Sequence, residues 1–515
     1  MRTTLAIVLS GILAALPVAA QNGASWRPEE RVLLSDFSFV SALARDNDVL
    51  YAVTPNGLLV YDLTAGAFRD PLTAEDGYPV EENPISITYA RAEFLLIVGT
   101  ARGGLFTLAT LAPRFTAVAR LPGPVLSLAS PQTGFESYAE TTAGWFRLRS
   151  VSLRPEPSAP PRPEPQPGRS DSYLASMLGT AGTVPGRPTA PVAALETGRI
   201  PGVYYAGTLG SGLVRLDTRT LERTRLPFGL NTRGVTAMAR WRGRLWFGGD
   251  SSAVNGSLVS ASEDLARFNE YPPRTGGPQR AITALLAADS VLWVGGLDGL
   301  AALEARNGDE RWHDFSTVVR EPVLNLTHAA GSVFVGTRSG AFVIRGGLAG
   351  GPAGRSIESV LTGTAVRGMA RGVDTLWIAS DAGLAALPLT GQAAQTRLVR
   401  ETSGPIGPVA DVAVTGDTVL VLTPEALYRR TAAGWSAPDP MPAAVGPLLR
   451  VEVLNGVTYV TGYRGAARGH ARGAGWDYYR APDDVPEGPV RDLLPGAETL
   501  WLATPAGALR ITDRR

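Results

Sequence analysis

The chain has 515 residues, of which 44% are hydrophobic and 18% are charged, so it can bury more than one core and is not compositionally disordered. Every basic side chain is an arginine, and the net charge of +1 excludes nucleic-acid binding driven by bulk charge. The lack of cysteine excludes disulfides, thiolate metal sites and cysteine nucleophiles.

The first 20 residues predict a secretory signal peptide. Arg2 supplies the positive start, residues 5–16 form a mostly apolar run, and residues 18–20 are small enough for a signal peptidase. A transmembrane anchor is the alternative, but a helix needs roughly 20 apolar residues to span a bilayer. We therefore expect an exported protein, in the periplasm or on the outer cell surface, with no transmembrane segment after cleavage.

A unit of about 43 residues then repeats along the chain. Clear copies are Leu292–Gly296, Leu376–Ser380 and Leu500–Thr504, each with a tryptophan in second place and a glycine and an apolar run after it. The position of this tryptophan recurs at intervals of 39–47 residues, apart from one interval of 68. The eleven equivalent positions are Tyr51, Ile97, Ser137, Tyr205, Trp246, Trp293, Phe334, Trp377, Leu420, Tyr459 and Trp501.

Each unit divides into four short apolar runs bounded by Gly, Asp, Asn or Pro and rich in β-branched and aromatic residues, which is the pattern of β-strands. Four antiparallel strands in about 43 residues, repeated radially, are typical of a β-propeller blade. A helical solenoid would need a 3.6-residue period, which the units lack. The sequence therefore predicts an all-β propeller of about eleven four-stranded blades, with the tryptophans packed between blades.

The two ends of the sequence predict how the propeller closes. The eleventh unit ends soon after its third strand, and residues 31–37 form an isolated strand ahead of the first unit. Pairing of these segments would complete the last blade and cover an open sheet edge. Because a ring normally holds four to eight blades, eleven favour two rings over one. Divisions of five plus six, four plus seven and a single ring all stay open.

The interval of 68 residues, between Ser137 and Tyr205, sets the expected domain boundaries. Residues 21–150 hold the closing strand and the first three blades, residues 151–190 a proline-rich linker or insertion, and residues 191–515 the last eight blades. The linker is either a surface insertion within one ring or the crossover into a second, inserted ring.

The repeat resembles a known family. Leu292–Gly296 and Leu376–Ser380, each followed by Gly-Leu, are similar to the two-component-regulator propeller repeat, whose members form periplasmic sensor parts of hybrid histidine kinases. Residues 26–107, including Asn56–Asp62 and Leu95–Thr100, resemble the N-terminal propeller of the PorZ component of type IX secretion. That resemblance implies a cell-surface role in the attachment of secreted cargo and binding of anionic lipopolysaccharide.

A set of arginines is the candidate ligand site. They fall at or just before the first strand of their units, so radial repetition would bring them near one face of a ring. Guanidinium groups suit carboxylate, sulfate or phosphate groups, so the set predicts an anion-binding site. The alternative is that each arginine pairs with a nearby acid such as Glu321 or Asp492. The six residues are Arg233, Arg280, Arg320, Arg367, Arg450 and Arg491.

No catalytic, cofactor or metal site is predicted. The histidines, His313, His328 and His470, lie in different units, and the sequence has no zinc-protease, nucleophile-elbow, phosphate-loop or EF-hand motif. Short acidic groups such as residues 46–48 are more typical of solvated turns than of a calcium loop.

The sequence thus favours an exported propeller that binds or scaffolds at a bacterial cell envelope. Its expected partners are envelope or secretion proteins or an anionic glycan, without nucleic acid. Two alternatives are a propeller enzyme of lyase or glycosidase type and a periplasmic sensor ectodomain that works with a separate kinase. A funnel lined by a carboxyl of perturbed pKa would favour the enzyme, whereas a flat face of aromatics and arginine would favour binding.

Overall fold

The computed structural model describes residues 31–512, apart from gaps at 110–113, 132–134, 150–153, 162–189, 231, 233, 251–256, 272–276, 278–279, 347, 349–355, 390–396, 399–403, 405–406, 441–444 and 470–474. The expected signal peptide lies outside these residues. Within them the chain forms eleven antiparallel sheets, ten of four strands and one with a fifth short strand. The predicted all-β propeller of four-stranded blades is confirmed.

Helix in the described part of the chain is limited to three single turns of 3-10 helix, Ala74–Asp76, Val80–Glu82 and Arg91–Glu93. None of the described helices has the length and apolar character needed to cross a membrane.

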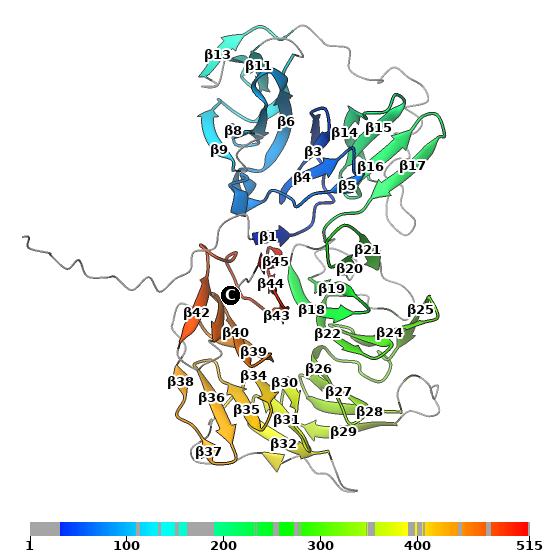
Figure 1. Ribbon diagram of the computed structural model, residues 1–515, viewed down its shortest axis with the longest axis vertical. Helices are drawn as coiled ribbons and strands as arrows, with labels where there is room; N and C mark the ends of the chain where they lie inside the picture. The colour runs from blue at the N-terminus through cyan, green and yellow to red at the C-terminus, as the bar shows by residue number, and fades with distance from the viewer. Residues whose placement is uncertain are drawn as a thin grey trace, which may run out of the picture.

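Seven of the sheets surround one axis in the lower half of Figure 1, and we call them the seven-sheet ring. Their first strands contact one another in sequence, and the last contacts the first. In that order they are β18 (Val235–Trp241), β22 (Ile282–Ala288), β26 (Val323–Ala329), β30 (Val366–Arg371), β34 (Asp411–Thr415), β39 (Leu448–Leu454) and β43 (Asp492–Pro495).

Each first strand continues outward into the other strands of its sheet. These are β19 (Arg244–Gly249), β20 (Ser257–Ser262), β21 (Phe268–Tyr271), β23 (Val291–Gly296), β24 (Gly299–Arg306), β25 (Asp309–Asp314), β27 (Ser332–Thr337), β28 (Gly340–Arg345), β29 (Ser356–Thr362), β31 (Thr375–Ser380), β32 (Gly383–Pro388), β33 (Arg397–Leu398), β35 (Thr418–Leu422), β36 (Ala426–Thr431), β37 (Gly434–Trp435), β38 (Asp439–Pro440), β40 (Val457–Gly462), β41 (Gly465–Gly469), β42 (Trp476–Arg480), β44 (Thr499–Thr504) and β45 (Gly507–Thr512).

The last sheet of the ring takes its fourth strand from the beginning of the described chain. Strand β1 (Arg31–Leu34) pairs antiparallel with β45, with Val32 opposite Arg510. Gly507 permits this close approach, because its φ is +142° and a Cβ there would lie 1.9 Å from the carbonyl oxygen of Leu34. The pairing expected for residues 31–37 is found for residues 31–34.

The other four sheets form a group that is inserted between β1 and β18, at the top of Figure 1. Their strands are β2 (Ala42–Arg45), β3 (Val49–Thr54), β4 (Gly57–Asp62), β5 (Ala67–Phe68), β6 (Pro84–Ala90), β7 (Leu95–Thr100), β8 (Gly104–Ala109), β9 (Thr116–Arg120), β10 (Val125–Ala129), β11 (Glu136–Thr141), β12 (Gly144–Arg149), β13 (Arg154–Ser158), β14 (Val192–Thr197), β15 (Val203–Thr208), β16 (Gly212–Asp217) and β17 (Glu222–Leu226).

The long sequence interval falls inside this inserted group. First strands contact one another in the order β10, β6, β2, β14, so the sheet after the interval packs beside the first sheet of the group rather than the third. The proline-rich segment therefore does not lead into a new ring, and its beginning forms β13, the fourth strand of the third sheet. The rest of that segment, 162–189, lies outside the described residues.

The insertion leaves and rejoins the ring at one place. Asp36 and Leu230 form a parallel bridge, and the Leu230 amide donates to the carbonyl of Ser35 at 2.8 Å. The ring of Phe228 lies between those of Phe37, Phe68 and Phe268, at centroid distances of 5.9, 4.6 and 4.9 Å. These contacts couple the inserted group to the seven-sheet ring through an aromatic cluster.

Tryptophans of the repeat pack inside the seven-sheet ring, as predicted. Trp246, Trp293 and Trp501 are at most 2% exposed. Trp501 of the last sheet meets Phe247 of the first at a centroid distance of 5.4 Å, so an aromatic pair joins the sheets where the ring closes. Trp377 is only partly buried, and the guanidinium of Arg430 lies 5.4 Å from its ring centroid.

Candidate functional site

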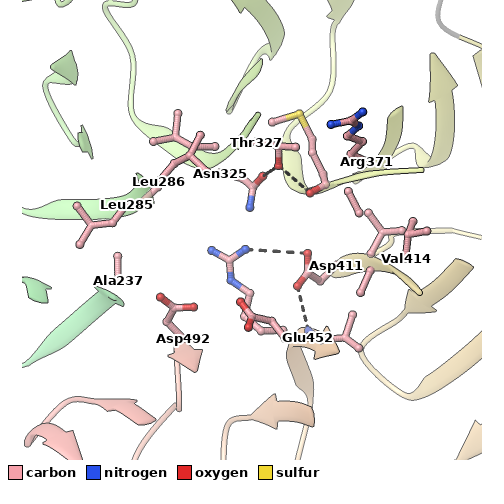
Figure 2. A pocket seen from close by; sticks show the side chains of 18 of the residues that line it. Ala237, Leu285, Leu286, Asn325, Thr327, Arg371, Asp411, Val414, Glu452 and Asp492 are labelled. Atoms are coloured by element: carbon pink, nitrogen blue, oxygen red, sulfur yellow. Dashed lines mark hydrogen bonds and ion pairs between the residues drawn. The ribbon is translucent and has the colours of Figure 1, made fainter. Parts of the chain in front are cut away.

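All seven first strands line a central cavity of about 390 Å³, which we call the channel (Figure 2). Because strand residues alternate between two faces, one repeated position of each unit faces the channel. Four of the seven units carry a small or neutral residue there and three carry a charge. In ring order the equivalent residues are Ala237, Ala284, Asn325, Gly368, Asp411, Arg450 and Asp492, and all except Gly368 line the cavity.

The three charged positions lie on neighbouring strands and form a cluster with Glu452, two residues after Arg450 on β39. One oxygen of Asp411 accepts a hydrogen bond from the Val451 amide at 2.9 Å, and one of Asp492 accepts from the Met238 amide at 2.7 Å. Each aspartate is thus held by the backbone of the next strand in the ring. We call Asp411, Arg450, Glu452 and Asp492 the channel cluster.

The cluster contains more negative than positive groups. Nη1 of Arg450 lies 4.0 Å from Oδ1 of Asp411, a loose ion pair. Gly368 makes room for this carboxylate, because a Cβ on Gly368 would lie 1.8 Å from Asp411 Oδ1. Within the described residues, Glu452 has no hydrogen-bond partner.

Burial is the main cause of raised carboxyl pKa values in this cluster. It raises the pKa of Glu452 to about 8, with the negative charges of Asp492 and Asp411 adding to the effect and Arg450 opposing it. The pKa of Asp411 rises to about 6, and that of Asp492 is also raised, both mainly by burial and again opposed by Arg450. At pH 7 Glu452 therefore holds a proton.

A second cavity, of about 760 Å³, lies where the first strands begin, and we call it the mouth. Arg450 lines both cavities and therefore stands between the mouth and the channel. Tyr463, whose exposed fraction is 51%, lines the mouth together with Arg367 and Arg491. Its apolar lining comes from Leu324, Val409, Ala410, Leu448, Leu449, Pro408, Pro424, Pro447 and Pro489.

The structure brings three of the six sequence-predicted arginines to the mouth, and each has an acid near it. Arg367 donates two hydrogen bonds to Asp381, at 2.9 and 3.1 Å, and these bonds raise its pKa. Arg491 lies 3.7 Å from Asp250, and Arg450 belongs to the channel cluster. These three arginines therefore carry little uncompensated positive charge. This agrees with the alternative stated in the sequence analysis, in which each arginine pairs with a nearby acid.

Two of the other predicted arginines, Arg280 and Arg320, do not line either cavity. Arg320 is exposed and donates to the carbonyl of Thr317 at 2.8 Å, and Arg280 is also exposed. Arg233 lies outside the described residues.

Sequence reasoning missed the carboxyls of the channel. A signal for two of them was present, because aligned units have Asp411 and Asp492 where other units have alanine, asparagine or glycine. Glu452 stands two residues further along its strand, on the same face, as strand alternation requires. Tyr463 and Asp381 come from turns four residues after the equivalent positions Tyr459 and Trp377, so the repeat places them alike, a signal that the sequence analysis did not use.

Of the histidines that the structure describes, neither His313 nor His328 lines the channel or the mouth. His313 contacts Glu304 at 3.0 Å between β25 and β24, away from the channel, and His470 lies outside the described residues. The described part of the chain holds no group of three or more His, Asp or Glu side chains arranged to hold a metal ion.

A ring of four-stranded sheets around a channel defines the β-propeller class, and solved propellers resemble this chain. The extracellular domain of the putative hybrid two component system BT3049 from B. thetaiotaomicron is 13% identical, with a TM-score of 0.44, covering 93% of this chain and 68% of its own. PorZ, a surface component of the type-IX secretion system of Porphyromonas gingivalis, is 12% identical, with a TM-score of 0.34, covering 92% and 81%.

Virginiamycin B lyase from Staphylococcus aureus is a third similar structure, 14% identical with a TM-score of 0.42, covering 55% of this chain and 96% of its own. The two kinds of propeller that the sequence resembles are thus found among the structural neighbours, and at these identities the likeness is one of fold. No known family profile and no curated protein matches the chain.

Proposed function

We propose that this protein is an exported β-propeller that binds a ligand in the mouth and channel of its seven-sheet ring. The observation that carries the proposal is the mouth cavity of about 760 Å³, which shares the lining residue Arg450 with the channel. Ligand sites are typically concave, mostly apolar and provided with a few polar groups that orient the ligand. The mouth has this composition, with Tyr463, Arg367 and Arg491 among aliphatic side chains and prolines.

The rim of the mouth is well suited to binding because it is preorganised. Four of its lining residues are prolines, three from loops between sheets and Pro424 from the turn between β35 and β36, and proline fixes the backbone φ near −65°. The ion pair between Arg367 and Asp381 holds a further side chain in place. A rigid rim loses little conformational entropy when a ligand binds.

Export and an envelope partner complete the proposal. The signal-peptide pattern of residues 1–20 supports export, and the expected partners are an envelope or secretion protein or a glycan. Binding rather than chemistry is the first candidate because apolar and aromatic surface dominates the mouth.

The test is affinity capture from bacterial envelope extracts with the mature protein, followed by identification of bound protein and glycan. The double variant Tyr463→Ala, Arg491→Ala alters the mouth. Val373→Ala is the matched control, because Val373 is 76% exposed at the other end of β30. We expect the wild type and the control to capture the same ligand and the double variant to lose it. Equal capture by all three proteins would refute the proposal.

A second candidate function is acid–base catalysis, because the channel holds carboxyls with separated pKa values. Glu452, with a pKa of about 8, is protonated at pH 7, whereas Asp411, with a pKa of about 6, is mostly ionised. Such a pair can act as proton donor and acceptor in a lyase or glycosidase. The test is release of reducing ends or unsaturated products from a polysaccharide panel, and activity that survives Glu452→Gln would exclude this assignment.

A further inference from the structure

The charge of the channel points to the kind of group that its ligand presents. Three carboxyl residues and one guanidinium line its enclosed part, all from the neighbouring strands β34, β39 and β43. The remaining charged lining residue, Arg371, is exposed at the end of β30, away from the mouth. The channel cluster therefore has two negative groups in excess when all of its members are ionised.

The hydrogen bonds of the channel cluster leave one of its carboxyls without a partner. The Val451 amide occupies Oδ2 of Asp411, whose Oδ1 lies 4.0 Å from Nη1 of Arg450, and the Met238 amide occupies Oδ2 of Asp492. Glu452 is without a hydrogen-bond partner in the described chain, and it faces the channel (Figure 2). A carboxyl that lacks a protein partner and faces a cavity can accept hydrogen bonds from a ligand.

Charge complementarity decides among the classes of ligand. At pH 7 an anion would meet the carboxylates of Asp411 and Asp492, which the single guanidinium of Arg450 does not offset. A bare metal ion is not favoured, because no three or more His, Asp or Glu side chains among the described residues are arranged to hold one. A cationic nitrogen group supplies both the charge and the N–H donors that the carboxyls lack.

We propose that the channel binds an ammonium or guanidinium group of the ligand, with Glu452, Asp411 and Asp492 as its acceptors. This inference rests on the proposed function and names the chemistry of its ligand. The apolar mouth accommodates the aliphatic stem, and Arg450 moves aside or lies against that stem at the passage between the two cavities. The group belongs either to a lysine or arginine side chain of a partner protein or to a free amine.

Binding of such a cation changes the protonation of the channel. At neutral pH Glu452 is a neutral carboxylic acid, since its pKa is about 8. A cation beside it favours the ionised form and lowers that pKa. The O–H bond of Glu452 then breaks, its proton leaves to solvent, and the carboxylate accepts hydrogen bonds from the ligand. Binding of a cation should therefore release close to one proton, whereas binding of an anion would take protons up.

The test is isothermal titration calorimetry at pH 7 in two buffers of different ionisation enthalpy, phosphate and HEPES. The probes are agmatine, which carries a guanidinium and an ammonium on a four-carbon stem, a blocked tripeptide with central lysine, and glutarate as the anion. We expect agmatine or the peptide to bind with release of close to one proton. Preference for agmatine indicates a free amine as the natural ligand, and preference for the peptide indicates a protein side chain.

Variants make the test specific. Glu452→Gln should abolish the proton release and weaken binding at least tenfold, whereas Glu358→Gln, at an exposed ion pair on β29, should bind as the wild type does. Binding of glutarate with proton uptake, or no binding of either cation, would overturn the inference. If the cations fail while the mouth variants still lose their captured ligand, the proposed function stands and only the cation assignment falls.

Discussion

The substitution Glu452→Gln examines the electrostatics of the channel through protein stability. The pKa of Glu452 moves from an ordinary value of 4.5 to about 8 on folding, which corresponds to about 4–5 kcal/mol between its two protonation states. Glu452 is half-buried and faces a cavity that water can enter, so we expect about half of this, ~2 kcal/mol, to appear in the free energy of unfolding.

The sign follows from proton binding. Between pH 4.5 and about 8 the folded chain holds a proton on Glu452 that the unfolded chain has lost, so the free energy of unfolding falls as the pH rises through this range. Glutamine resembles the protonated acid at every pH. The variant should therefore be about as stable as the wild type at pH 4.5 and about 2 kcal/mol more stable at pH 9.

Urea unfolding at the two pH values measures this difference, with tryptophan fluorescence as the signal because Trp246, Trp293 and Trp501 all lie in the seven-sheet ring. Glu358→Gln is the control. Its exposed ion pair with Arg345 predicts a change below about 0.5 kcal/mol at either pH. Equal effects of Glu452→Gln at both pH values, or a loss of stability at pH 9, would refute the reasoning.

Two further substitutions test the packing of the site and of the junction. Gly368→Ala places a Cβ against the Asp411 carboxylate, so we expect a loss of about 2–3 kcal/mol in urea unfolding. The same alanine should cost much less in the background of Asp411→Ala, and equal costs in both backgrounds would show that the two residues do not collide. Phe228→Ala removes the shared ring of the aromatic cluster and should lower stability by about 2–4 kcal/mol. Phe135→Ala, at a side chain 67% exposed, should change stability by less than about 0.5 kcal/mol, and a Phe228→Ala effect no larger than that would contradict the coupling.

The repeat made the fold predictable from the sequence. Each unit carries its own turn residues and apolar runs, so eleven similar stretches independently indicated the same four-stranded sheet. The pairing of β1 with β45 was also predictable, because a last unit with three strands and an unused strand at the other end leave one consistent solution.

The order of the sheets was not predictable in the same way. Sheets of one repeat present similar edges and faces, so local patterns do not determine which neighbour each sheet takes. The packing of β14 against β2 depends on contacts between residues about 150 positions apart, such as Arg45 and the carbonyl of Gly198, at 3.3 Å. The same limit applies to the place where the insertion leaves the ring.

The candidate site was predicted in part. Arg367, Arg450 and Arg491 do lie together at the mouth, because equivalent positions of neighbouring units share one end of the ring. The sign of the local charge was missed because the acids beside these arginines were overlooked, although Asp250 and Asp381 both stand four residues after a tryptophan of the repeat. A count of arginines on one face therefore overestimates the positive potential of that face.

Closure of the seven-sheet ring by both ends of the described chain is the claim on which the channel depends. The chain has no cysteine, so the pair Val32→Cys, Arg510→Cys introduces the only two thiols. These residues are opposite one another in β1 and β45, and the Cα separation of opposed antiparallel residues suits a disulfide.

Non-reducing electrophoresis after mild oxidation measures the cross-link directly, with Val32→Cys, Arg345→Cys as the control pair. The structure requires a monomeric cross-linked species of altered mobility for the first pair and none for the control. A first pair that stays reduced, or that forms only dimers, would contradict the closed ring and with it the channel that holds Asp411, Arg450, Glu452 and Asp492.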